Sequence, residues 1–299
     1  MRVLVTGASG FIGAAVMRLL LEQEVETAAL VSAGKPLDRL RDLDTRFVRI
    51  EGRLADILTL RPQLEAFRPD ACIHLAWYAE PGKYLYSPEN VPIMQQSLSL
   101  LQTLIEIGCQ QFVGVGTCAE YDTDVGFLRE DGPTNPATIY AACKLSMCLI
   151  GQHMAAAAGV NFAWGRLFYL YGEQEDSRRL VPAVIQSLRQ GKPFDATAGE
   201  QVRDYLHTTD VASALITLVQ QNTHGIYNIA SGIPITMRNL MENIGEIVGG
   251  KDLIRFGAIP YRQWEPMFIC GDNHKLKSLG WSPRYTLREG LTQTIGWWT

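Results

Sequence analysis

Two short motifs have the residue types and spacing that carbonyl chemistry with a dinucleotide cofactor requires. The first, at residues 6–13, is the glycine-rich turn Thr-Gly-Ala-Ser-Gly-Phe-Ile-Gly between an apolar strand and an apolar helix. Without Cβ atoms, backbone amides and a helix start can approach a pyrophosphate. The second is Tyr140 with Lys144, which share one helix face. We expect the Lys144 ammonium to favour the ionised form of the Tyr140 phenol at a pH well below about 10. A dinucleotide site together with such a tyrosine predicts hydride transfer coupled to proton transfer.

Regular elements that would position these motifs alternate along the first half of the chain. Short apolar segments rich in β-branched residues alternate with helical patterns. Helices are expected at 11–22, 92–107 and 138–158, the last of which carries Tyr140 and Lys144. The pattern predicts an α/β fold of the Rossmann type, a doubly wound parallel sheet. Its strands are predicted at residues 2–6, 27–31, 46–50, 71–75, 111–115, 161–167 and 225–229.

The alternation breaks after Leu167 into a stretch rich in Tyr, Gly, Pro and charged residues, with one helix expected near 179–190. Later helices are expected from Thr209, at 237–248 and near 287–298. We expect a smaller, interleaved C-terminal substrate lobe that closes over the carboxyl edge of the sheet. The expected division is a dinucleotide-binding domain at 1–167, to which 207–231 returns, and a substrate-binding lobe at 168–206 and 232–299.

Composition is that of an ordinary soluble globular protein, with 299 residues, 47% hydrophobic and 19% charged. The net charge of −4 argues against nucleic acid or an anionic membrane as the main partner. No apolar leader and no run of about 18 apolar residues is found, so we expect a cytoplasmic protein. The 6 cysteines lack metal-ligand spacing, which favours reduced, buried thiols and no metal site.

Further motifs follow the glycine-rich turn in a fixed order. With them, the chain resembles the extended short-chain dehydrogenase/reductase family, in its branch of nucleotide-sugar epimerases, dehydratases and ketoreductases. The resemblance implies a nucleotide-sugar substrate and a homodimer through the helices that carry the Tyr–Lys pair, for which Met147, Cys148, Ile150 and Gly151 offer apolar material. The motifs that carry it are His74-Leu75-Ala76, residues 116–121, Glu130-Asp131, Tyr140 with Lys144, residues 166–172, Arg203-Asp204-Tyr205 and Asp210-Val211-Ala212.

The resemblance also implies roles for individual residues. Tyr140 would donate the proton, Lys144 would lower its pKa and bind the nicotinamide ribose, and Thr117 would hold the substrate oxygen. Cofactor contacts are implied at Gly7, Ser9, Gly10, Phe11, Ile12, Gly13, Ser32, Lys35, Leu54, Leu75, Ala76, Tyr140 and Lys144. Substrate contacts are implied at Tyr78, Cys118, Ala119, Tyr169, Val181, Arg203 and Arg262.

Residues near Thr117 help to separate the reactions of this branch. Dehydratases carry an acidic pair directly after the active-site Ser or Thr, where this chain has Cys118 and Ala119, so dehydration is disfavoured. Combined epimerase-reductases use a Cys and a His where this chain has Ala119 and Arg179. A ketoreductase with a dissociable cofactor and a 4-epimerase that retains its cofactor remain. A catalytically silent dinucleotide-binding regulator is disfavoured because such proteins often lose the Tyr or the Lys.

Cofactor choice favours the ketoreductase. The second strand ends at Val31 without the Asp or Glu that NAD-selective members present to the adenosine ribose. Lys35 and Arg39 follow it and suit a 2′-phosphate. We therefore predict NADPH, with NAD as the other possibility. The predicted reaction is NADPH-dependent reduction of a nucleoside-diphosphate 4-keto-6-deoxy sugar, and the alternative is an NAD-dependent nucleotide-sugar 4-epimerase.

Overall fold

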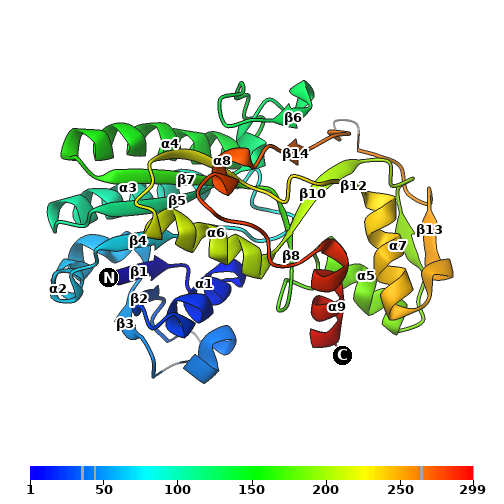
Figure 1. The fold of residues 1–299 in the computed structure, drawn as a ribbon, viewed down its shortest axis with the longest axis horizontal. Coiled ribbons are helices and arrows are strands. Elements are labelled where there is room, and N and C mark those ends of the chain that lie inside the picture. Colours follow the sequence, from blue (N-terminus) through cyan, green and yellow to red (C-terminus); the bar gives the residue numbers. More distant parts are fainter. Residues whose placement is uncertain (35–36, 44, 263–264, 299) are drawn as a thin grey trace.

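The computed structural model describes residues 1–299 except 35–36, 44, 263–264 and 299. Within the described chain, the main sheet has seven parallel strands in the order β11-β7-β5-β4-β1-β2-β3 (Figure 1). The predicted Rossmann-type sheet is confirmed, and its strand order reverses between β1 and β4. The strands are β1 (Arg2–Thr6), β2 (Glu26–Val31), β3 (Val48–Glu51), β4 (Ala71–His74), β5 (Gln111–Thr117), β7 (Asn161–Leu167) and β11 (Gly225–Ile229).

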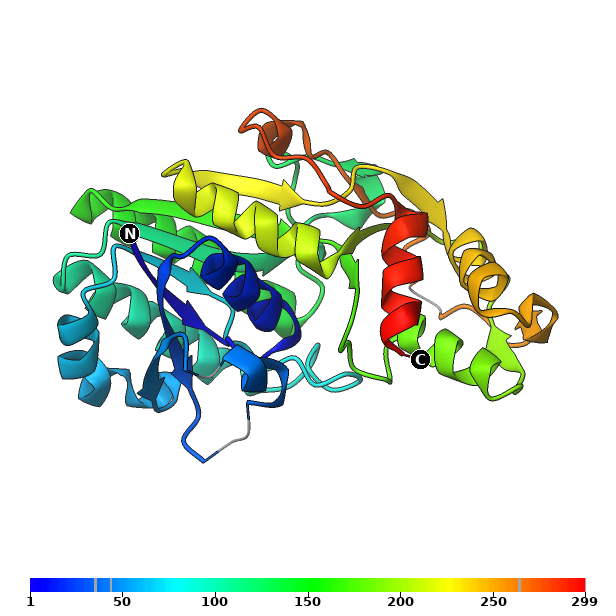
Figure 2. The same cartoon turned by 60° about the horizontal axis from the view of Figure 1, so that its bottom comes forward.

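Helices cover both faces of this sheet because successive strand residues point to opposite sides. Val3 and Val5 of β1 pack with α1 (Phe11–Glu22) and α6 (Thr208–Gln220) on one face. Leu4, between them, packs on the other face, and the two layers are visible in Figures 1 and 2. The helices of that second face are α2 (Ile57–Phe67), α3 (Asn90–Glu106) and α4 (Ile139–Ala158).

A smaller lobe, at the right of Figure 1, is built around three helices that share an apolar core of residues such as Val184, Leu240 and Leu291. Its strands form a three-stranded sheet β12-β10-β8 and a pair β13-β9. The sequence did not predict these strands, and four of them have only three residues, which carry too little periodicity, whereas β10 has six. The elements are β8 (Tyr169–Tyr171), β9 (Phe194–Ala196), β10 (Val202–His207), β12 (Pro234–Thr236), β13 (Ile254–Phe256), α5 (Leu180–Arg189), α7 (Met237–Val248) and α9 (Leu287–Trp297).

The helix α4, which carries Tyr140 and Lys144, is bounded by local signals. Thr138 accepts a hydrogen bond from the Ala141 amide at its start, and Gly159 ends it with φ +67°. Among the described residues, no helix is long and apolar enough to cross a membrane. The remaining short elements are β6 (Phe127–Leu128), β14 (Cys270–Gly271) and α8 (His274–Lys277).

Candidate active site

The glycine-rich turn lies between the carboxyl end of β1 and the start of α1. Gly7 has φ +68°, and a Cβ added there would lie 2.7 Å from the Ala76 nitrogen. A Cβ on Gly13 would lie 2.1 Å from the Gly7 carbonyl oxygen. Among the described residues, no side chain caps the start of α1, so its first N–H groups can bind an anion. A dinucleotide pyrophosphate fits this turn. Its other predicted contacts, Ser9, Gly10, Phe11 and Ile12, are partly exposed there.

Residues after the neighbouring strands reach the same edge of the sheet. The amide of Leu75 donates to the Thr6 carbonyl at 3.1 Å, and the amide of Ala76 donates to the Thr6 hydroxyl at 3.3 Å. Ser32 directly follows β2 and is partly exposed. The side chain of Leu54, in contrast, is buried in the core with α2 and α3, so only its backbone could face a cofactor.

Two residues after β2 are predicted to contact the 2′-phosphate of NADPH. Lys35 lies outside the described residues, whereas Arg39 is described. The Arg39 guanidinium donates to the Ser9 carbonyl at 3.3 Å and to the Gln174 carbonyl at 2.9 Å. It therefore lies against the glycine-rich turn and joins that turn to the segment between β8 and α5.

Tyr140 and Thr117 meet where β5 ends beside the start of α4. Thr117 lies near the phenol, and the Tyr84 and Tyr140 rings pack edge to face with ring centroids 4.8 Å apart. Burial, and next the neighbouring Tyr84, raise the pKa of Tyr140 above its ordinary value, which the nearby Thr117 hydroxyl lowers only in part. The phenol is therefore neutral at physiological pH.

Lys144 lies deeper, and its side chain is 4% exposed. Its Nζ donates to the Val115 carbonyl at 2.7 Å and lies 3.7 Å from the centroid of Trp77 and 6.0 Å from that of Tyr140. Burial lowers the pKa of Lys144 to about 7. The expectation that Lys144 shifts Tyr140 towards its ionised form is wrong for this geometry, because burial penalises the charged form of both groups.

A chain of hydrogen bonds below the glycine-rich turn holds the end of β4. The Thr6 hydroxyl bonds to His74 Nδ1 at 2.7 Å, and His74 Nε2 bonds to the Ser97 hydroxyl at 2.9 Å. Because Ser97 donates to the Ile93 carbonyl, the proton of the neutral ring is assigned to Nε2. Burial lowers the pKa of His74 to about 3, so this histidine stays neutral.

A buried ion pair that the sequence analysis missed lies directly behind Thr117. Glu120 accepts hydrogen bonds from the Thr117 amide at 2.9 Å, from Trp164 Nε1 at 3.1 Å and from Arg166 Nε at 2.7 Å. Thr117 and Glu120 also form the reciprocal cap of the 3-10 turn Cys118–Glu120. The Thr-x-x-Glu spacing of this cap is the sequence signal that could have revealed the Glu120 contact.

Three of the predicted substrate residues form one cluster. Arg203 is 3% exposed, its guanidinium lies 5.4 Å from the centroid of Tyr169, and its charge acts on Cys118. Its Nη2 donates to Glu265 at 2.6 Å, so the carboxylate partner of Arg203 is distant in sequence. Burial raises the pKa of Cys118 to about 12, so this thiol stays protonated.

The remaining predicted substrate residues are not part of that cluster. The Tyr78 phenol donates to Glu80 at 3.2 Å, and Ala119 is partly exposed beside Thr117. Arg262 is exposed, and it directly precedes residues 263–264, which lie outside the described residues. The expected side-chain contact of Val181 is corrected, because this residue is 1% exposed in the apolar core of the smaller lobe.

The segment between β8 and α5 brings further charges to the site that the sequence analysis did not assign. Arg179 lies 5.4 Å from the centroid of Tyr84, the ring that packs against Tyr140. Glu175 has a carboxylate oxygen that is buried without a partner among the described residues, and burial raises its pKa to about 8. Charged residues in a polar loop usually indicate a solvated surface, so no sequence signal distinguished them.

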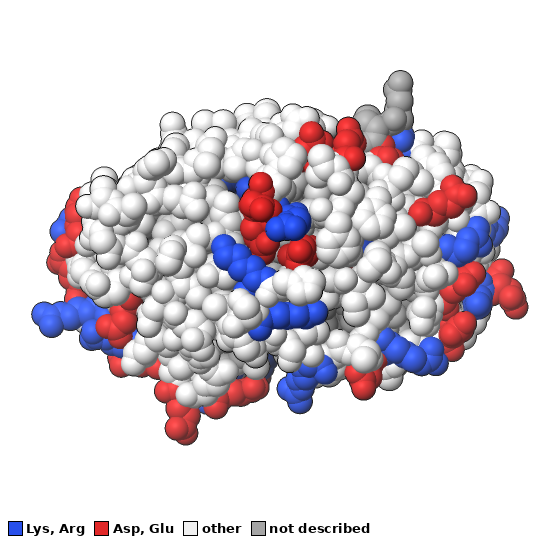
Figure 3. Space-filling model, turned by 45° about the horizontal axis from the view of Figure 1, so that its top comes forward, with Lys and Arg blue, Asp and Glu red and all other residues white. Residues whose placement is uncertain are grey.

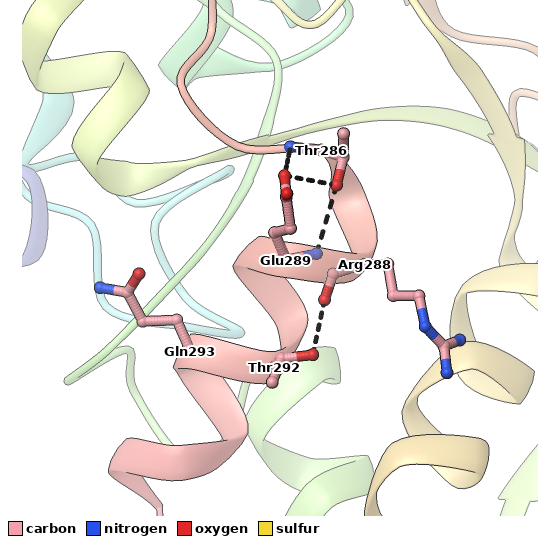
Figure 4. A pocket seen from close by; sticks show the side chains of 5 residues that line it. All are labelled: Thr286, Arg288, Glu289, Thr292 and Gln293. Atoms are coloured by element: carbon pink, nitrogen blue, oxygen red, sulfur yellow. Dashed lines mark hydrogen bonds between the residues drawn. The ribbon is translucent and has the colours of Figure 1, made fainter.

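An open hollow along α9 contains none of the predicted site residues within the described chain (Figure 4). Thr286 and Glu289 use their side chains to cap the start of α9, and Thr292 donates to the Arg288 carbonyl. The polar groups shown there therefore serve mainly the helix itself. Elsewhere too, the described residues include no group of three His, Cys, Asp or Glu that could hold a metal ion.

Comparison with known proteins agrees with this geometry. Residues 3–230 match the NAD dependent epimerase/dehydratase family. The chain is 24% identical to a CDP-abequose synthase of Salmonella typhimurium, covering 98% of this chain and 97% of that protein. It is 27% identical to a UDP-glucose 4-epimerase of Corynebacterium glutamicum, covering 96% and 92%.

Solved structures with the same fold cover the whole chain. A UDP-glucose 4-epimerase from Thermotoga maritima has a TM-score of 0.88 at 25% identity, covering 100% of this chain and 98% of that one. The dTDP-glucose 4,6-dehydratase DesIV from Streptomyces venezuelae, solved with NAD bound, has a TM-score of 0.88 at 26% identity, covering 100% and 97%. The resemblance to extended short-chain dehydrogenases is thus confirmed, and the chain belongs to the NAD-dependent epimerase/dehydratase family of oxidoreductase-type enzymes.

Proposed function

We propose that the protein is an NADPH-dependent ketoreductase that acts on a nucleoside-diphosphate 4-keto-6-deoxy sugar. The observation that carries this proposal is the neutral phenol of Tyr140, which lies near Thr117 at the carboxyl edge of the sheet and packs against Tyr84. Reduction of a carbonyl starts from a protonated acid, which the raised pKa of Tyr140 provides. A 4-epimerase starts with oxidation, in which a phenolate must accept the proton, and burial disfavours that form.

Each of the three residues has a defined task in this reaction. The Thr117 hydroxyl holds the carbonyl oxygen of the sugar, and Tyr140 donates its proton to that oxygen as the alkoxide develops. Lys144 binds the nicotinamide ribose. Its ammonium form has three N–H donors, of which the Val115 carbonyl takes one. When bound in the glycine-rich turn, NADPH supplies the hydride.

The relatives include enzymes that support each of the two candidate reactions. Similarity to a CDP-abequose synthase favours a ketoreductase, and similarity to UDP-glucose 4-epimerases supports the alternative. Dehydration remains disfavoured because Cys118 and Ala119 offer no acid after Thr117. We propose that the sugar nucleotide binds between the main sheet and a lobe formed by 168–206 and 232–299, with its diphosphate near Arg203. The 6 cysteines are free and buried, which supports a cytoplasmic location.

The test is incubation of the purified protein and NADPH with a panel of 4-keto-6-deoxy nucleotide sugars, followed by loss of NADPH absorbance. One member of the panel should be reduced with one NADPH consumed per sugar. Interconversion of 4-hydroxy epimers without added cofactor would instead establish the NAD-dependent epimerase. Tight NADPH binding with no turnover of either substrate class would favour the regulator.

Arg39 carries a prediction on cofactor choice. Its guanidinium lies against the Ser9 carbonyl of the glycine-rich turn, which supports a contact with a 2′-phosphate. Arg39→Ala should raise KM for NADPH by about 10- to 100-fold and leave KM for NADH nearly unchanged, because only NADPH carries the extra charge. Arg41→Ala is the control, since Arg41 is exposed and paired with Asp38. Equal losses with both cofactors would contradict the phosphate contact.

We also propose a homodimer formed through α3 and α4. The upper left of the surface in Figure 3, on the side where Figure 1 places α4, carries few charges, and Leu149 and Ile150 of α4 are 50% and 42% exposed. Met147 and Cys148 are instead buried in the core of their own subunit, which corrects the expectation that they form the dimer surface. Exposed apolar residues on a helix surface with few charges are typical of a subunit interface.

Replacing both Leu149 and Ile150 by Glu should convert the protein to monomers, because like charges would face each other across the two-fold axis. Size-exclusion chromatography with light scattering measures the mass. The control is Val125→Glu, at an equally exposed apolar residue outside both helices. A double variant that keeps the mass of a dimer would place the interface elsewhere.

A further inference from the structure

We propose that the buried Glu120–Arg166 pair is a positioning unit of the active site, which orients Thr117 and sets the balance of charge around Lys144. Neither residue contacts the reacting atoms, so both act through their neighbours. The consequence for turnover rests on the proposed ketoreductase activity. The effect on Lys144 can be measured without that activity.

The first part of the argument is the orientation of Thr117. The Glu120 carboxylate holds the Thr117 amide at 2.9 Å, and the Thr117 hydroxyl accepts the Ala119 amide at 3.2 Å. With that oxygen lone pair occupied, the hydroxyl proton is left to point at Tyr140 or a substrate oxygen. The turn is tight, because a Cβ on Gly116 would lie 2.3 Å from Glu120 Oε1. Glu120 thus fixes the backbone that carries the Thr117 hydroxyl.

The second part is the charge of the pair. Glu120 is 0% exposed and Arg166 is 1% exposed. The three groups that hydrogen-bond the Glu120 side chain among the described residues are all N–H donors, as a carboxylate requires. Arg166 also stacks on Tyr121 with its guanidinium carbon 4.1 Å from the ring centroid. Because desolvation of two charges offsets their attraction, such a pair adds little to stability, and a role in the site accounts for it.

The third part of the argument is that Trp164 lies between Glu120 and Lys144. Trp164 donates to both Glu120 oxygens, and its ring centroid lies 6.0 Å from Lys144 Nζ. Burial lowers the pKa of Lys144, and the charge of Glu120 opposes that shift. His74 and Tyr140 are neutral, and among the described residues Glu120 is the charged group that acts on Lys144. The titratable groups that face Lys144 are His74 on β4, Tyr140 on α4 and Glu120 after β5, and the Glu120 carboxylate is paired with Arg166 on β7.

Trp77 provides a direct probe, because Lys144 Nζ lies 3.7 Å from the centroid of its ring. A change of charge at that distance should alter the fluorescence of the indole. The difference in fluorescence between the wild type and Trp77→Phe, followed against pH, should show one transition near pH 7. Lys144→Met should abolish it, which assigns the transition to the amine.

Glu120→Gln should move the midpoint of this transition down by about one pH unit, because the amine loses an opposite charge. Arg166→Met should also move it down, because the buried carboxyl then loses the guanidinium that favours its charged form and takes up a proton. The high-pH limb of NADPH oxidation should shift in the same directions. The control is Asp176→Asn, which alters an exposed ion pair with Arg178 and should leave the midpoint in place.

A midpoint in Glu120→Gln equal to that of the wild type would overturn the proposal, because a merely structural role lowers stability without moving the titration. Should Glu120→Gln fail to fold, the double variant E120Q/R166M, which removes both charges together, takes its place. Its midpoint should also lie below that of the wild type, and an unchanged midpoint would overturn the proposal. A wild type without reductase activity would count against the proposed function alone, since the Trp77 titration is independent of turnover.

Discussion

Tyr140→Phe is expected to lower kcat with a 4-keto sugar nucleotide by about 10²- to 10⁴-fold, the usual contribution of a positioned general acid. The variant keeps the ring that packs against Tyr84 and removes only the hydroxyl near Thr117. The glycine-rich turn is untouched, so the Kd for NADPH should change little. Steady-state kinetics and a fluorescence titration with NADPH measure the two quantities separately.

The matched control for Tyr140 is Tyr86→Phe, which removes the same hydroxyl from a residue that is 58% exposed. Its kcat should equal that of the wild type. If Tyr140→Phe retained full turnover, another group would have to protonate the sugar. A variant that lost NADPH binding as well as turnover would show that the phenol supports the cofactor site.

Gly13→Ala is expected to weaken NADPH binding by about 10- to 100-fold, because overpacking of this kind costs about 1–3 kcal/mol. The added Cβ would lie 2.1 Å from the Gly7 carbonyl and 2.8 Å from the Ala8 Cα, both backbone atoms that cannot rotate away. The turn and the start of α1 must therefore separate. That separation displaces the N–H groups that bind the pyrophosphate. Calorimetric titration with NADPH measures the loss of affinity, and a thermal melt measures the loss of stability.

Gly296→Ala is the control for the same substitution in a helix, since a Cβ there meets no atom of the described residues within 4 Å. It should leave Kd unchanged and should not lower Tm. Wild-type affinity in Gly13→Ala would mean that the pyrophosphate does not lie on this turn.

The strands, helices and turns that depend only on residues close together in the chain could be predicted from the sequence. Apolar runs predicted the strands β1 and β7 at their observed bounds, and helical periodicity predicted α1 at residues 11–22. The glycine spacing predicted the turn because the lack of a Cβ is a property of each residue alone. Helical spacing placed Tyr140 and Lys144 on one helix, α4.

The charge states and the partners of the site residues could not be predicted from the sequence, because they arise from contacts in the folded chain. The pKa of Tyr140 rises, against the expectation from its neighbour Lys144, because residues from several elements exclude water from both groups. Arg203 pairs with Glu265 and Glu120 with Arg166, contacts between residues far apart in the chain. Desolvation and pairing depend on the whole folded environment, which local periodicity does not encode, and they set the chemistry that the predicted residues can perform.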